Sequence, residues 1–374
     1  MQTIAATRLC YAAAHVAWKP WLGRTRARRN PEELARHIDR EATARVRKVL
    51  DALGFGIAEA MDTAQRFSLG WPAARELIAL CGDLGIEHGF VAGAGYDHLR
   101  KVRSLSELVD GVLYQASLIR EHGGIPMILP MPWLCERRAN EEVYVDAYAA
   151  IFRQIEGPLF VHWLGEAFRA DLAGYFPGDS FARVMGLAPE KVRGCKLSLL
   201  DAGRERAIRA ELLARDQIVL TGDDLHFDRL IRGEGERPPE VLRWTRIGNR
   251  RVALGDFSHA LLGVLGPIAR PAARALEALA RGDDGTYTEI MAACARLGRH
   301  LFAPPTSHYK AGVAFLAWLS GLQDEFLLLD GEHESRDAAH LRRAAELAVA
   351  CGALDLDERA RRRLSSLGSG RREN

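Results

Sequence analysis

The sequence predicts an α/β protein built as a (β/α)8 TIM barrel with a C-terminal helical extension. Short apolar runs alternate with longer amphipathic stretches, which is the pattern of parallel βαβ units. The runs number eight, whereas a doubly wound open sheet usually has about five or six strands. None of the turns after these runs carries the Gly-x-Gly-x-x-Gly motif of dinucleotide-binding sheets. A closed barrel is therefore favoured.

Strands are expected at the apolar runs, and helices where apolar residues recur at positions i, i+3, i+4 and i+7. The predicted strands cover residues 8–15, 54–61, 88–95, 124–130, 158–164, 194–200, 217–222 and 251–257. Helical patterns between them include residues 31–53, 71–84 and 104–122.

The pattern after the last predicted strand is helical only. A helix over residues 267–283 is expected to close the barrel. The apolar stretch 312–322 is expected to lie in a helix that mediates self-association. We therefore predict three parts, which are a barrel over 1–283, a C-terminal helical extension over 284–365 and a disordered Ser/Gly/Arg-rich tail over 366–374.

Composition and charge exclude several classes of protein. Of the 374 residues, 48% are hydrophobic and 27% are charged, which is the balance of a globular protein with a large core. The formal net charge of +2 argues against a nucleic-acid binder. No apolar stretch approaches the roughly 20 residues of a membrane span, and residues 1–20 do not resemble a signal peptide. Six scattered cysteines favour reduced thiols, so we expect a cytoplasmic protein.

Ionisable and polar residues follow almost every predicted strand. In a (β/α)8 barrel, catalytic groups lie at the C-terminal ends of the strands and on the loops that follow. The residues found there include His15, Glu59, Asp62, Thr63, His162, Lys196, Asp223, Asp224 and His259. The basic loop at 21–29 also follows the first strand, where it either attracts an anionic substrate or is simply solvated.

Lys196 is the most informative of these residues, because it lies inside an otherwise apolar strand. Side chains alternate along a strand, so Lys196 and Ser198 share one face while Cys195 and Leu197 share the other. A lysine that faces the barrel loses solvation, which disfavours its ammonium form and yields a nucleophilic amine near neutral pH. Two alternatives stay open, which are a lysine paired with a carboxylate for stability and one that binds an anion.

The sequence resembles the dihydrodipicolinate synthase and N-acetylneuraminate lyase superfamily of class I aldolases, and within it an uncharacterised dihydrodipicolinate synthase-like branch. The resemblance runs from about His37 to Pro304. The segments that carry it are residues 38–65, the Gly-x-Gly at 93–95, Gly-Gly-Ile-Pro-Met-Ile-Leu-Pro at 123–130, Gly-Cys-Lys-Leu-Ser at 194–198 and Leu-Thr-Gly-Asp-Asp at 220–224. The Gly-Cys-Lys segment is similar to the family's Gly-Ile-Lys strand, which carries the Schiff-base lysine.

The sequence also departs from the family pattern. His162 stands where the family has the tyrosine of a Tyr-Asn-x-Pro motif that relays protons, and Met131-Pro132-Trp133 replaces the usual tyrosine pair after strand four. In the Thr-Thr-Gly-Glu-like turn after strand two, Thr63 fits the pattern but Asp62 does not. A carboxylate at that position argues against a simple pyruvate-type substrate.

The resemblance implies a lyase or aldolase that acts on a small 2-oxo acid or a keto-sugar-derived substrate without a cofactor. Lys196 is expected to form the imine, with His162 in place of the proton-relay tyrosine and Asp62 as a third catalytic residue. The expected substrate-binding residues are Thr63, Glu59, Gly222, Asp223, Asp224, His15 and His259. Related barrels are commonly dimers or tetramers, so a homodimer or homotetramer is expected.

Two other readings of the residues stay open. A metal-dependent sugar isomerase or hydro-lyase would use the mixed carboxylates and imidazoles at the strand ends as ligands, although no His-x-His or His-Glu-x-x-His signature is present. A barrel without catalytic activity would bind a small ligand or act as a scaffold.

Overall fold

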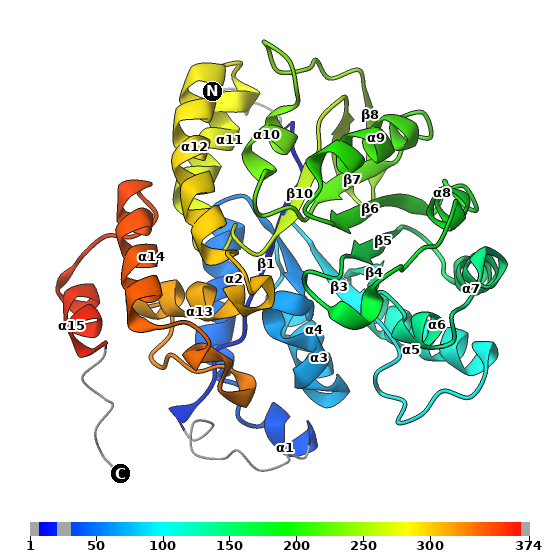
Figure 1. Cartoon of the computed structure of the whole chain (residues 1–374), viewed down its shortest axis with the longest axis horizontal. Helices are drawn as coiled ribbons and strands as arrows, with labels where there is room; N and C mark the ends of the chain where they lie inside the picture. The colour runs from blue at the N-terminus through cyan, green and yellow to red at the C-terminus, as the bar shows by residue number, and fades with distance from the viewer. Residues whose placement is uncertain (1–6, 21–30, 368–374) are drawn as a thin grey trace.

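The computed structural model describes residues 7–20 and 31–367. Within them, eight parallel strands form a closed barrel in the spatial order β1-β10-β7-β6-β5-β4-β3-β2 (Figure 1). The barrel strands are β1 (Cys10–Ala13), β2 (Gly56–Glu59), β3 (Phe90–Ala94), β4 (Ile125–Ile128), β5 (Leu159–Leu164), β6 (Val192–Ser198), β7 (Ile218–Thr221) and β10 (His259–Leu262). The predicted (β/α)8 barrel is confirmed.

Helices connect successive strands around the outside of the barrel. They are α1 (Pro31–Ala35), α2 (Arg40–Ala52), α3 (Arg66–Leu69), α4 (Trp71–Asp83), α5 (Leu105–Glu121), α6 (Pro132–Glu136), α7 (Glu141–Gln154), α8 (Ser180–Met185), α9 (Ala202–Leu213), α10 (Phe227–Arg232) and α11 (Ala269–Ala280). Four of the longer ones begin at a polar residue whose side chain accepts a backbone N–H of the first turn, namely Asp39, Ser104, Asn140 and Asp201.

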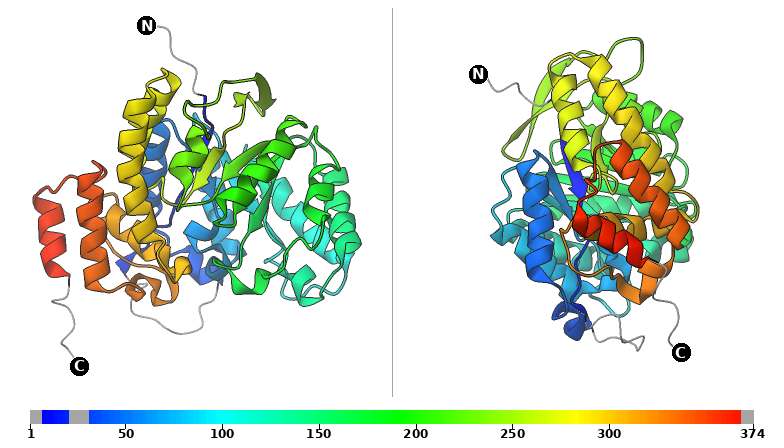
Figure 2. Two further views of the ribbon diagram at one scale, coloured as in Figure 1. Left: turned by 45° about the horizontal axis from the view of Figure 1, so that its top comes forward. Right: turned by 90° about the vertical axis from the view of Figure 1, so that its left-hand side faces the viewer.

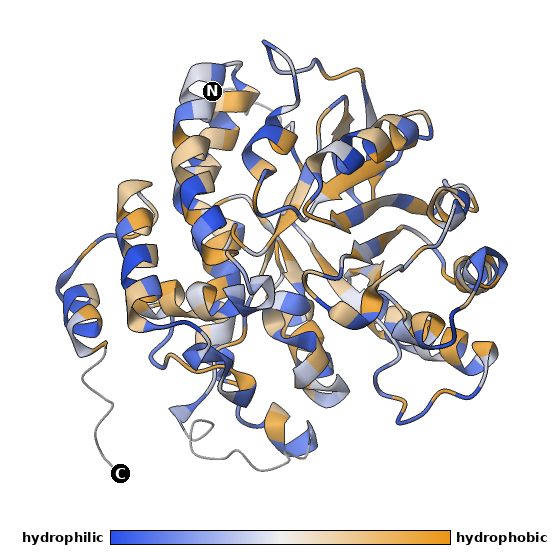
Figure 3. Cartoon of the chain, in the orientation of Figure 1, coloured by the Kyte–Doolittle hydropathy of each residue, from blue (hydrophilic) through white to orange (hydrophobic). Residues whose placement is uncertain are grey.

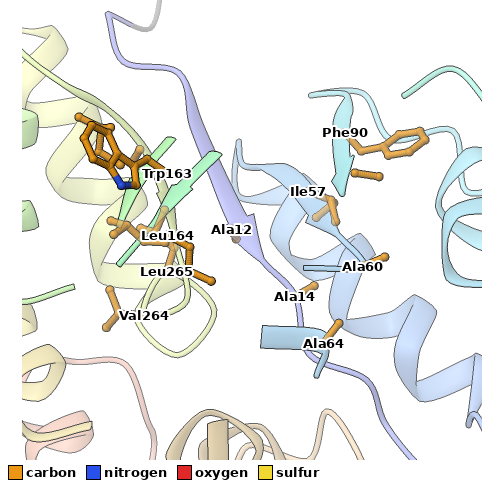
Figure 4. Packing of buried hydrophobic residues seen from close by; sticks show 14 of the residues in the cluster. Ala12, Ala14, Ile57, Ala60, Ala64, Phe90, Trp163, Leu164, Val264 and Leu265 are labelled. Atoms are coloured by element: carbon orange, nitrogen blue, oxygen red, sulfur yellow. The ribbon is translucent and has the colours of Figure 1, made fainter. Parts of the chain in front are cut away.

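Two large apolar clusters account for most of the core. The first fills the barrel interior and includes Tyr11, Phe160 and Leu220. The second lies between the strands and the helices, where small side chains such as Ala12 and Ala60 let the helices pack closely (Figure 4). The surrounding helices carry both polar and apolar residues, as expected for helices with one buried face (Figure 3).

The prediction of the eighth strand at 251–257 is wrong. Most of that segment is β9 (Arg250–Leu254), which pairs antiparallel with β8 (Arg243–Ile247) in a hairpin outside the barrel. The true eighth strand, β10, follows it and pairs with β1 and β7. The segment is a strand as predicted, but its partner is β8. It is apolar because its side chains Val252 and Leu254 pack in the cluster at the barrel interior.

The C-terminal helices are α12 (Asp284–Leu301), α13 (Tyr309–Leu319), α14 (Ala338–Ala350) and α15 (Glu358–Ser366), with a 3-10 segment, η5 (Leu329–Glu334), after α13. Helices α14 and α15 lie along one flank of the molecule (Figure 2). Almost every residue of α13 is buried within this chain. Its apolar character is therefore explained by packing in the chain itself, which corrects the prediction that it serves self-association.

Three predictions from the sequence are not tested by the structure. The basic loop at 21–29 lies outside the described residues, as does the predicted tail from residue 368 onward. The boundary at residue 283 stays a prediction. In the described part of the chain, no helix is both long and apolar enough to cross a membrane.

Candidate active site

Lys196 and His162 lie side by side on adjacent strands. Lys196 of β6 is in register with His162 of β5 on one side and with Leu220 of β7 on the other. Leu220 belongs to the cluster inside the barrel, as does Phe160, two residues before His162. Because side chains alternate along a strand, Lys196 and His162 point into the barrel.

The amine of Lys196 is buried without a partner. The residue is 7% exposed, and among the described residues its Nζ makes no hydrogen bond or ion pair. Burial lowers the pKa of Lys196, while the negative charges of Asp224 and Asp62 oppose this effect. The amine is therefore neutral at lower pH than that of an exposed lysine, and the neutral amine is the nucleophilic form.

Gly222, directly after β7, makes room for this amine. A Cβ at Gly222 would lie 2.9 Å from Cε of Lys196 and would also meet Oγ of Ser198. The backbone N–H of Gly222 donates to the carbonyl oxygen of Leu197 at 2.7 Å, so this loop is held against β6. Glycine is required here because the two backbones approach closely. The sequence predicted substrate binding for Gly222, and the structure places it against the lysine side chain.

Asp224 provides a buried carboxyl group near Lys196. Its Oδ1 accepts the backbone N–H of Val264 at 2.8 Å. Burial raises the pKa of Asp224, and the hydrogen bond from Val264 and the charge of Lys196 offset this only in part. The site therefore contains a carboxyl group and an amine whose pKa values are shifted toward each other, a pattern that is frequent at catalytic sites.

His162 is held as a neutral imidazole. Its Nε2 lies 3.3 Å from Oγ of Ser198, and Nδ1 is buried without a hydrogen-bond partner among the described residues. Burial and the positive charge of Lys196 lower the pKa of His162 well below its usual value. Ser198 is the side chain that orients the His162 ring.

The turn after β2 meets the C-terminal extension. Asp62 and Thr63 lie in a 3-10 turn, η2 (Asp62–Ala64), and both contact the phenol of Tyr309 at the start of α13. The Tyr309 hydroxyl donates to Oδ2 of Asp62 at 2.9 Å and lies 2.8 Å from Oγ1 of Thr63. Because the phenol proton is given to Asp62, Thr63 donates to the phenol oxygen. Thr63 therefore holds Tyr309, whereas substrate binding was predicted for it.

Lys310 extends this contact. Its Nζ lies 3.6 Å from Oδ2 of Asp62 and 3.2 Å from Oε1 of Glu332, and donates to the carbonyl oxygen of Ser307 at 2.7 Å. The Gln65 side chain donates to Oε2 of Glu332 at 2.6 Å. Neither Tyr309 nor Lys310 is among the site residues predicted from the sequence. The only signal is two polar residues at the start of an apolar helix, and the sequence does not show where that helix lies.

Two predicted substrate-binding residues lie elsewhere. Both carboxylate oxygens of Glu59 are bound by Arg47, at 2.9 and 3.0 Å, and the side chains of this pair are fully buried. His15 binds Gln323 through Nε2 at 2.6 Å, and burial lowers the pKa of His15 to about 4. These contacts join α2 to β2 and the barrel to the segment after α13, so both predictions are corrected to structural roles.

His259 and Asp223 are also engaged in structural contacts. His259 begins β10, so it lies at the N-terminal end of the barrel, where its Nδ1 accepts the N–H of Leu9 at 2.8 Å and its Nε2 lies 3.0 Å from the carbonyl oxygen of Ala253. It was placed at the wrong end because the eighth strand was misassigned. Asp223 accepts the backbone N–H of His226 and binds its ring Nδ1 at 2.8 Å, just before α10.

The proposed metal ligands are not gathered at one place. Glu59 is paired with Arg47 and His259 lies at the opposite end of the barrel. Among the residues that the structure describes, no group of three or more His, Cys, Asp or Glu side chains is arranged to hold a metal ion.

Comparison with known proteins places the chain in a family. A family model described as "Protein of unknown function (DUF993)" matches residues 1–369. The chain belongs to this family. No match was found among curated protein sequences.

Solved structures resemble this DUF993 chain closely in fold. A putative dihydrodipicolinate synthetase from Pseudomonas aeruginosa has a TM-score of 0.66 at 13% identity, over 92% of this chain and 99% of that one. CdNal from Clostridium difficile, in complex with mannosamine, has a TM-score of 0.64 at 12% identity, over 92% and 99%. Dihydrodipicolinate synthase from Cyanidioschyzon merolae, with lysine bound, has a TM-score of 0.64 at 14% identity, over 94% and 100%. The predicted resemblance is confirmed at the level of the fold.

The structural role of Glu59 in this DUF993 chain can be tested by Glu59→Gln. Removing one partner leaves a buried charge without compensation, so the free energy of unfolding is expected to fall by about 3–5 kcal/mol in urea denaturation. Glu76→Gln is the matched control, because it breaks the exposed Arg40–Glu76 pair and is expected to cost about 1 kcal/mol or less. Unchanged stability of Glu59→Gln would contradict the structural role.

Proposed function

We propose that this chain is a Schiff-base-forming lyase or aldolase that acts on a small 2-oxo acid or keto-sugar-derived substrate. The observation that carries this proposal is the amine of Lys196, which is buried inside the barrel and free of hydrogen bonds and ion pairs within the described residues. A lysine placed there for stability would be paired, because an unpaired buried charge is costly. Burial lowers the pKa of Lys196 to about 8, so a larger fraction of this amine is neutral near neutral pH than of an exposed lysine, and the neutral amine is suited to attack a carbonyl carbon.

The chemistry follows from imine formation. The lone pair of Nζ adds to the substrate carbonyl carbon, water leaves to give an imine, and the imine nitrogen takes one proton from solvent to become the protonated imine. A base then removes the proton of a substrate hydroxyl, and the hydroxyl oxygen forms the carbonyl of the first product as the neighbouring carbon–carbon bond breaks. The electron pair of that bond flows into the protonated imine to give an enamine. Protonation of the enamine and hydrolysis of the imine return the free amine of Lys196. The steps need no electron acceptor beyond the imine itself.

We assign the proton transfer at the substrate hydroxyl to His162. Its ring lies on the strand next to Lys196, and its lowered pKa keeps it neutral and able to accept a proton at neutral pH. The positive charge of the protonated imine at Lys196 disfavours a second positive charge on His162. It therefore keeps the imidazole neutral before the proton transfer and favours the release of the proton by the imidazolium afterwards. Ser198 fixes the ring orientation through Nε2.

The assembly and location expected from the sequence stay predictions. A homodimer or homotetramer is proposed from the resemblance, and light scattering in solution tests it. The cytoplasmic location is likewise a proposal.

Imine formation is tested by borohydride reduction in the presence of a panel of small 2-oxo acids and ketoses, followed by peptide mass mapping. The expected result is one adduct, on Lys196, lost in Lys196→Met. Lys310 is an internal control, because it is also a buried lysine but its amine is engaged by Ser307 and Glu332. A panel compound that turns over without leaving an adduct on Lys196 would rule out the imine mechanism.

The assignment of His162 is tested by His162→Phe. This change is expected to preserve folding and the Lys196 adduct but to lower kcat by about 10²-fold or more, the usual scale for acid–base groups. Any limb that His162 contributes to the pH–rate profile is expected below pH 6.5, because burial lowers its pKa. His88→Phe, before β3 at the opposite end of the barrel, is the control. An unchanged kcat in His162→Phe would assign the proton transfer to another group.

A further inference from the structure

The carboxylate of Asp62 is held from one side only. Both donors from the C-terminal extension act on the same oxygen, Oδ2, with the Tyr309 hydroxyl at 2.9 Å and Nζ of Lys310 at 3.6 Å. Among the described residues, the other oxygen, Oδ1, makes no hydrogen bond. The Asp62 side chain is 14% exposed. One oxygen is therefore fixed, and the other is available to a substrate.

Tyr309 is locked in the position that this contact requires. Its ring stacks on Phe302 at 4.2 Å between centroids and 17° between planes. A Cβ at Gly263, directly after β10, would lie 2.8 Å from the Tyr309 ring, so glycine is needed for the ring to reach the turn after β2. Burial and the charge of Asp62 raise the pKa of Tyr309 well above its usual value. The phenol therefore stays protonated and remains a donor to Asp62.

Lys310 supplies the positive charge that keeps this arrangement balanced. It lies between the carboxylates of Asp62 and Glu332, and Glu332 is bound in turn by Gln65 of the same turn as Asp62. Gln65 also accepts the backbone N–H of Leu329 at 2.8 Å. The turn that carries Asp62 is thus tied at several points to the segment from α13 to η5.

We propose that Asp62 is the catalytic base that transfers the proton on the carbon next to the imine, and that Tyr309 and Lys310 are positioning residues which the C-terminal extension contributes to the site. This inference rests on the proposed function, because it assumes an imine at Lys196. It is supported by the free oxygen of Asp62 and by the electrostatic interaction between Asp62 and Lys196.

The proton and the electron pairs of this transfer are accounted for in both directions. Oδ1 of Asp62 takes a proton from the carbon adjacent to the protonated imine, and the electrons of that C–H bond form the C=C bond of the enamine while the C=N electrons move to Nζ of Lys196. In the reverse direction the carboxylic acid returns the proton to carbon and the imine forms again. In D2O, this cycle replaces hydrogen by deuterium on the substrate carbon without any bond to a second substrate.

The test separates imine formation from proton transfer in the full-length chain. Hydroxypyruvate and dihydroxyacetone serve as probes for a substituted 2-oxo acid and a ketose. Borohydride trapping on Lys196, read by mass spectrometry, reports the imine. Deuterium incorporation in D2O, read by NMR, reports the transfer at carbon. The variants are Asp62→Asn, Tyr309→Phe, which retains the stacked ring, and Lys310→Gln, with Tyr287→Phe as the control.

Tyr287 is a matched control because it is also a buried tyrosine of the C-terminal helices, and its hydroxyl donates to the carbonyl oxygen of Asp228 at 2.7 Å. Asp62→Asn is expected to keep the adduct but to lower kcat of deuterium exchange by about 10²-fold or more. Tyr309→Phe and Lys310→Gln are each expected to lower it about 10-fold, with KM for the probe within about twofold, since they weaken contacts to a charged group. Tyr287→Phe is expected to leave both readouts unchanged.

Different results would overturn imine formation at Lys196 and proton transfer by Asp62. An adduct on Lys196 together with unchanged exchange in Asp62→Asn or Tyr309→Phe overturns the role of Asp62 and its positioning but leaves imine formation intact. Loss of the adduct in a folded Tyr309→Phe also overturns it, because the phenol would then act on the lysine itself. Absence of any adduct with the wild-type chain overturns the imine and this inference together.

Discussion

The structure depends on keeping the amine of Lys196 inside the barrel without a partner. Burial of an amine is unfavourable for its charged form, and this cost is what lowers the pKa of Lys196 and makes the amine a nucleophile. The surroundings are adapted to this one constraint. Gly222 leaves space for the side chain, and Asp224 and Asp62 act on it electrostatically without pairing with it. His162, on the neighbouring strand, is kept neutral by the same burial and by the lysine charge.

The C-terminal extension is part of this arrangement. Its helix α13 is buried along almost its whole length, and its first two residues contact the turn after β2. The same extension binds His15 through Gln323 and Gln65 through Leu329. Packing of α13 therefore holds the turn that carries Asp62, so the role that we propose for Asp62 depends on the extension.

The sequence predicted the barrel and the place of Lys196 because both depend on local patterns. Alternation within one strand put Lys196 inside and Cys195 outside, and Cys195 does lie in the cluster beneath the helices. The failures are non-local. The hairpin strand β9 has the same apolar pattern as a barrel strand, so His259 was assigned to the wrong end. Glu59 could not be recognised as the partner of Arg47, nor Tyr309 as the partner of Asp62, because these pairs form only when distant segments pack together.

The most direct measurement is the reactivity of Lys196 as a function of pH. Competitive labelling with trace acetic anhydride, read by peptide mass mapping, reports the neutral fraction of each amine, with the exposed Lys48 as the internal reference. Because burial lowers the pKa of Lys196, its labelling is expected to reach half of its maximum well below the pH of about 10.4 that is typical of a lysine. A midpoint at or above that of an ordinary lysine would contradict the account.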